Sequence, residues 1–116
     1  MPDESLEPEA ASPNPEPELS EEERLEKAKG IYVEAEGKAA DGDWAAAVDL
    51  YEQAYYLVPG KHGFALKVAV AAEKASNCEK AIKYFEHFVK YAEGEKYKDD
   101  LASAKRSLAA LKKSGC

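Results

Sequence analysis

The spacing of apolar residues along the chain predicts helices throughout its length after residue 20. Apolar positions recur at steps of three and four, the spacing typical of amphipathic helices. The third of these segments is apolar nearly all round, which predicts a central helix with neighbours on more than one side. No segment alternates as a strand does, so the sequence predicts an all-α fold. The expected helices cover residues 21–40, 44–58, 62–75, 78–92 and 97–113.

Capping residues stand at the expected helix ends. Ser20 and Glu23 have the spacing of a capping box, in which each side chain bonds the backbone N–H of the other. Gly42 can take a positive φ after the first helix, and Asp43 can cap the second. Asn77 is the expected cap of the fourth. The remaining breaks are expected at Pro59-Gly60, Gly94 and Ser114-Gly115.

Charge divides the 116 residues into two parts. Residues 1–23 hold nine acids and no Lys or Arg, whereas the remainder has 14 acids against 16 bases. Five of the six prolines lie in residues 1–17, and proline disfavours helix. We therefore expect a disordered, acidic Pro/Glu-rich tail over 1–18 and a helical domain over 19–116. The tail is either a solubilising leader or a recognition segment in polyproline II conformation.

Several classes of function find no support in the sequence. No apolar run reaches the ~18 residues of a membrane span, and the N-terminus has no signal-peptide pattern. The domain lacks the clustered bases and interleaved aromatics typical of nucleic-acid binding. There is no nucleotide-binding loop and no paired-histidine motif, and His62 and His87 are expected at the surface. We therefore predict a protein that is not an enzyme and uses no cofactor or metal.

An internal repeat suggests the architecture. A shift of 34 residues places Ala35 on Ala69 and Tyr51 on Phe85. With two helices per unit, the chain resembles a bacterial-type tetratricopeptide repeat protein, and the first unit matches that consensus closely. It carries Ala28, Ile31, Tyr32, Ala35, Gly42-Asp43-Trp44, Ala47, Tyr51, Ala54 and Pro59. The resemblance implies a right-handed α-solenoid of five antiparallel helices: repeat one (28–61), repeat two (62–95) and a capping helix (97–113). The chain departs from the consensus at Lys38, Ala65, Phe88 and Glu93.

The resemblance also implies a binding face. Tetratricopeptide arrays bind partner segments on the concave face, which the first helix of each unit lines. Three residues would be apolar anchors (Tyr32, Leu66, Val70), and four would set orientation (Lys29, Glu36, Lys67, Glu73). The family's clamp for chaperone tails needs Lys and Asn where this chain has Tyr32 and Glu36. We therefore expect a non-catalytic protein or peptide-binding scaffold that does not use this clamp.

Two alternatives to groove binding stay open. Two repeats are fewer than the three that usually give stability, so the apolar strip can instead serve self-association into a homo-oligomer. The tail can also be the binding element, with the helices as its carrier.

The two cysteines suggest a covalent link. In a stack of antiparallel helices, the start of the fourth helix lies beside the end of the fifth, which brings Cys78 toward Cys116. A disulfide there would close a loop of about 40 residues and stabilise by about 2–4 kcal/mol. A bridged protein belongs in the periplasm or at the cell surface, and one with two separate thiols belongs in the cytoplasm.

Overall fold

The computed structural model describes residues 19–115 and confirms the all-α fold. The described residues form five α-helices and no strand. The helices are α1 (Glu21–Ala40), α2 (Trp44–Leu57), α3 (His62–Lys74), α4 (Cys78–Tyr91) and α5 (Lys98–Lys113). The 3₁₀ turn η2 (Glu95–Tyr97) precedes α5, so α5 begins one residue later than predicted. The predicted tail, 1–18, and Cys116 lie outside the described residues.

The predicted caps form as the sequence indicates. The hydroxyl of Ser20 accepts a hydrogen bond from the Glu23 amide at 3.0 Å, and the Glu23 carboxylate accepts one from the Ser20 amide at 2.9 Å. The side chains of Asp43 and Asn77 accept hydrogen bonds from the amides three residues further on. Gly42 has φ +82°, a conformation that L residues rarely adopt, and it lets the chain reverse in three residues between α1 and α2.

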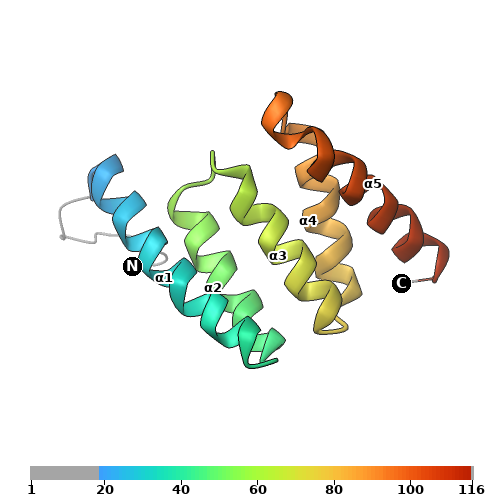
Figure 1. Cartoon of the computed structure of the whole chain (residues 1–116), viewed down its shortest axis with the longest axis horizontal. Helices are drawn as coiled ribbons and strands as arrows, with labels where there is room; N and C mark the ends of the chain where they lie inside the picture. The colour runs from blue at the N-terminus through green and yellow to red at the C-terminus, as the bar shows by residue number, and fades with distance from the viewer. Residues whose placement is uncertain (1–18, 116) are drawn as a thin grey trace, which may run out of the picture.

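The helices pack in chain order, each against the next (Figure 1). The α3 helix contacts both α2 and α4, which confirms its predicted central position. It is not covered on every side, since Val70 remains 36% exposed. The termini of the described chain therefore lie at opposite ends of the row of helices.

The core combines small residues where helices approach with aromatic rings between them. Ala35 and Ala69, the small residues of the two predicted repeats, are both fully buried. Phe85, Phe88 and Val68 are the largest side chains with almost no exposed surface. Close helix packing at the alanines holds the neighbouring side chains in fixed positions, and these side chains form the surfaces described below.

Candidate functional site

Three of the predicted binding residues come together between α1 and α3. The Lys67 ammonium nitrogen lies 3.4 Å from a carboxylate oxygen of Glu36 and 5.8 Å from the centre of the Tyr32 ring. The Tyr32 and Lys67 side chains are half-buried, and α2 contributes Tyr51 to this cluster. There the Tyr51 ring lies 5.8 Å from that of Tyr32, and its hydroxyl donates to Glu36.

A surface hollow of about 270 Å³ opens beside these residues, and we call it the α1–α3 groove. Tyr32 and Lys67 line it, together with three groups that the sequence did not lead us to place there: Lys61, Phe64 and Tyr97. The Phe64 ring lies 5.5 Å from the Tyr32 ring. Phe64 precedes Lys67 by three residues and so shares its helix face, which is a signal the sequence did contain. The contribution of Tyr97 depends on how η2 folds back, and no local pattern indicates it.

The Glu36 carboxylate of this site already has two partners within the protein, the Tyr51 hydroxyl and the Lys67 ammonium. The hydrogen bond from Tyr51 holds the pKa of Glu36 below its ordinary value, with a smaller effect from Lys67 that partial burial opposes. Burial, and then the bond to Glu36, raises the pKa of the Tyr51 phenol. Glu36 therefore stays ionised and positions Tyr51 and Lys67. The groove itself presents two cations, Lys61 and Lys67, among aromatic rings.

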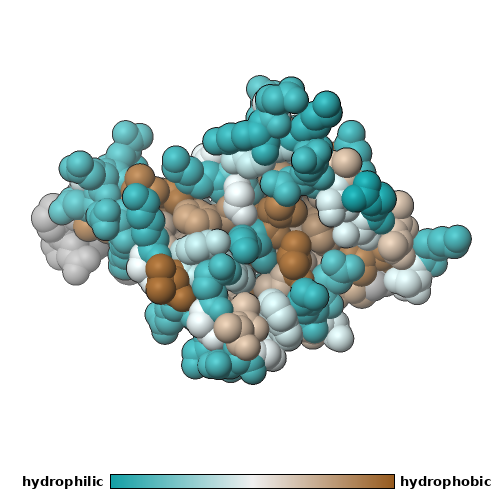
Figure 2. Space-filling model, in the orientation of Figure 1, coloured by the Kyte–Doolittle hydropathy of each residue, from teal (hydrophilic) through white to brown (hydrophobic). Residues whose placement is uncertain are grey.

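The other predicted binding residues lie outside the groove. Leu66 is half-buried against the core, whereas Lys29, Val70 and Glu73 are exposed. Val70 and Leu66 lie one helical turn apart on α3, so this face carries apolar surface. On the face of the described chain seen in Figure 2, apolar patches are separated by polar side chains and form no uninterrupted strip.

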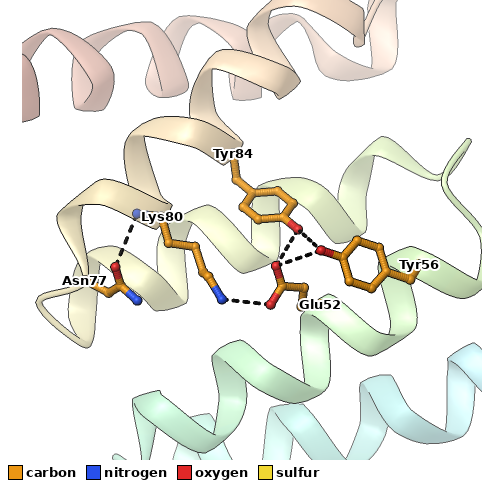
Figure 3. A network of polar contacts seen from close by, with 5 residues as sticks. All are labelled: Glu52, Tyr56, Asn77, Lys80 and Tyr84. Atoms are coloured by element: carbon orange, nitrogen blue, oxygen red, sulfur yellow. Dashed lines mark hydrogen bonds and ion pairs between the residues drawn. The ribbon is translucent and has the colours of Figure 1, made fainter. Parts of the chain in front are cut away.

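A second polar cluster joins α2 to α4 (Figure 3). One carboxylate oxygen of Glu52 accepts from the Lys80 ammonium at 2.8 Å. The other accepts from the hydroxyls of Tyr84 at 2.6 Å and Tyr56 at 3.2 Å. Burial alone raises the pKa of Glu52, but the bonds from Lys80 and Tyr84 outweigh it and hold the pKa below its ordinary value. We call these four residues the Glu52 network.

The two histidines, expected at the surface, are partly exposed and also contact other aromatic side chains. Both are half-buried, and their rings lie 6.3 Å apart. The His87 Nε2 and the Tyr55 hydroxyl share a 2.6 Å hydrogen bond. The Nδ1 atom of His62 is buried without a hydrogen-bond partner among the described residues. Burial lowers the pKa of His87, and the nearby His62 and Lys90 lower it further. Helix periodicity alone does not indicate that the His87 side chain contacts Tyr55 of α2.

Within residues 19–115, no three His, Cys, Asp or Glu side chains gather as metal ligands. No described helix is long and apolar enough to span a membrane. Cys78 is the first residue of α4, and the predicted Cys78–Cys116 bridge stays a prediction because Cys116 lies outside the described residues.

Comparison with known proteins leaves the family open. No protein-family model matches the chain, and no curated protein matches it significantly. The case for a function therefore depends on the geometry described above.

Proposed function

We propose that this protein is a non-catalytic interaction module that binds a segment of a partner protein in the α1–α3 groove. The observation that carries this proposal is the groove itself. Its aromatic side chains, Tyr32, Phe64 and Tyr97, come from three different elements and line one open hollow. Aromatic rings around a surface depression are typical of sites that anchor a partner's side chain.

We further propose that the module is built as two tetratricopeptide-type repeats with a capping helix. The 34-residue repeat, the helix pairs and the packing of each helix against the next all support this architecture. The first helix of each predicted unit, α1 and α3, supplies Tyr32, Phe64 and Lys67 to the groove. In such arrays the same helices line the face that binds peptides, so the position of the groove agrees with the proposed architecture.

The chemistry of the groove indicates the kind of segment that it binds. Glu36 already pairs with Lys67, and Lys61 forms no ion pair within the described part of the chain. An apolar side chain would fill the space among the rings, and a neighbouring carboxylate would meet Lys61. We therefore expect a peptide that combines an aromatic or aliphatic anchor with at least one adjacent acid.

Selection from a displayed library of random peptides tests the proposal and reveals which sequences the groove prefers. Selected peptides should combine an apolar anchor with an acid, and Tyr32→Ala should weaken their binding at least tenfold by fluorescence anisotropy. The matched control is Tyr91→Ala, because Tyr91 is 48% exposed on α4 and does not line the groove. Binding that survives Tyr32→Ala but is lost with Tyr91→Ala would exclude the groove as the site.

Light scattering on the full chain distinguishes this function from self-association. A monomer that binds selected peptides supports the interaction module. A stable dimer that dissociates on Leu66→Asp would instead favour a structural oligomerisation domain that uses the apolar part of α3. Loss of peptide binding when residues 1–18 are deleted would identify the tail as the binding element.

A further inference from the structure

A hollow of about 800 Å³ lies along one edge of the row of helices. Its walls come from the start of α1, the α2–α3 connection and η2, which reach the upper edge of the molecule in Figure 1. We call it the end hollow. It adjoins the α1–α3 groove, since Lys61 and Tyr97 line both.

The end hollow combines cationic side chains with aromatic and aliphatic surface. Arg24, Lys61 and Lys96 line it, and among residues 19–115 none of the three forms an ion pair. Glu21 is the single acid among the described residues of the lining, so the hollow is positive. Its apolar lining includes the rings of Tyr56, which is 62% exposed, and Tyr97. Such a surface favours a ligand that is both acidic and able to pack against aromatic rings.

The chain itself carries a segment with these two properties, immediately before α1. Residues 13–18 read Pro-Asn-Pro-Glu-Pro-Glu, so prolines alternate with polar residues, two of which are Glu16 and Glu18. Proline-rich segments in polyproline II conformation are recognised by aromatic-lined grooves. The acids in this segment would meet the cations of the hollow. The segment therefore complements the hollow in two ways: its prolines suit the aromatic rings, and its acids suit the cations.

The point where the segment joins the helices lies at the rim of the same hollow. The Arg24 guanidinium donates to the Leu19 carbonyl at 2.9 Å, and Glu21 and Arg24 are both part of the lining. The capping box at Ser20 and Glu23 fixes the direction in which the chain enters α1. Six residues in polyproline II conformation extend about 19 Å, and residues 13–18 directly precede Leu19 at this rim, so they need no linker to enter the hollow.

We propose that residues 13–18 dock into the end hollow of their own chain, with prolines against Tyr56 and Tyr97 and with Glu16 and Glu18 facing Lys61 and Lys96. The acidic segment is then an intramolecular ligand of the helical domain. This docking does not require the groove to bind a partner, so it is independent of the proposed function.

Charge reversal in the full chain tests the docking by NMR. In the unmodified protein, the amide shifts of Asn14 and Glu16 should differ from those of a synthetic peptide of residues 1–18. In Lys61→Glu/Lys96→Glu these amide shifts should move to the free-peptide values. Cleavage after Glu18 by a Glu-specific protease should also become about fivefold faster, as expected for the loss of two ion pairs. Both lysines are exposed, so the helices should remain folded.

The matched control is Lys83→Glu/Lys90→Glu, which changes the net charge equally at exposed positions of α4 outside the end hollow. It should leave the shifts of residues 14–18 unchanged. Adding Glu16→Lys/Glu18→Lys to Lys61→Glu/Lys96→Glu should move the amide shift of Asn14, which is unchanged in this variant, back toward its docked value. Three results would overturn the proposal: free-peptide shifts in the unmodified chain, an equal effect of the control, or shifts that depend on protein concentration, which would indicate docking into a second copy.

Discussion

Replacing Glu52 by glutamine removes the charge at the centre of the Glu52 network while keeping the size of the side chain. The two carboxylate oxygens of Glu52 accept hydrogen bonds from Lys80, Tyr84 and Tyr56. Glutamine offers one acceptor oxygen, and its NH₂ group would face either the Lys80 ammonium or the two hydroxyls. The substitution therefore removes the countercharge of Lys80 and leaves at least one donor without an acceptor.

The exposure of the Glu52–Lys80 pair to water sets how much Glu52→Gln should lower the free energy of unfolding. The side chains of Glu52 and Lys80 are 14% and 28% exposed, whereas those of Glu86 and Lys112, which join α4 to α5, are 50% and 55% exposed. Hydrogen bonds to charged groups contribute about 1.5–3 kcal/mol, and breaking a fully buried pair costs about 3–5 kcal/mol. Because Glu52 and Lys80 keep some access to water, we expect Glu52→Gln to cost about 2 kcal/mol. Glu86→Gln, at the exposed pair, should cost under ~1 kcal/mol.

Urea unfolding followed by far-UV circular dichroism measures both variants against the unmodified protein. With a urea dependence of about 2 kcal/mol per molar, Glu52→Gln should lower the midpoint by about 1 M. The midpoint of Glu86→Gln should fall by less than half as much. Equal destabilisation of the two variants would refute the reasoning, because it would mean that burial adds nothing to the Glu52 network.

The pH dependence provides an independent check. The bonds from Lys80 and Tyr84 outweigh burial and hold the pKa of Glu52 below its ordinary value in the folded protein, so its ionised form stabilises the fold above that ordinary value. This contribution is lost as the pH falls through the lowered folded pKa. The difference in unfolding free energy between the unmodified protein and Glu52→Gln should therefore be constant at neutral pH and shrink in acid. A difference that grows on acidification would contradict the assignment.

Two further predictions concern the core and the histidine pair. Phe88→Ala removes a fully buried ring and should lower the unfolding free energy by about 3–5 kcal/mol in a thermal or urea melt, whereas Val33→Ala, at a position 69% exposed, should change it by less than ~0.5 kcal/mol. His62→Gln should raise the pKa of His87 in an NMR titration of the imidazole protons, because burial and then His62 lower that pKa; an unchanged pKa would show that burial and Lys90 suffice.

Most of the helix boundaries could be predicted because they depend on local chemistry. The capping box at Ser20, the side-chain caps at Asp43 and Asn77, and the positive φ of Gly42 each involve residues within three positions of a helix end. The fully buried Ala35 and Ala69 could also be predicted, because the repeat aligned them. The caps follow from sequence because the interacting groups are neighbours along the chain.

The candidate site was predicted only in part. Tyr32, Glu36 and Lys67 were predicted for one binding face and lie close together, but Tyr97 reaches the groove from η2, more than 60 residues after Tyr32. Leu66 and Val70 share their helix with the groove residue Lys67 without lining the groove. Spacing along one helix indicates which residues share a face, but it does not indicate where a neighbouring element ends and leaves a hollow.

The sequence by itself therefore determined the fold class, the helix ends and the small residues of the core, since these depend on periodicity and on caps a few residues apart. Only the tertiary structure decided which polar groups meet. Glu52 contacts Lys80 and Tyr84 at separations of 28 and 32 residues, and Tyr55 contacts His87 across 32 residues. Such pairs depend on the rotation and offset of α2 against α4. That geometry is fixed by the packing of all the helices together and leaves no periodic signal in the chain.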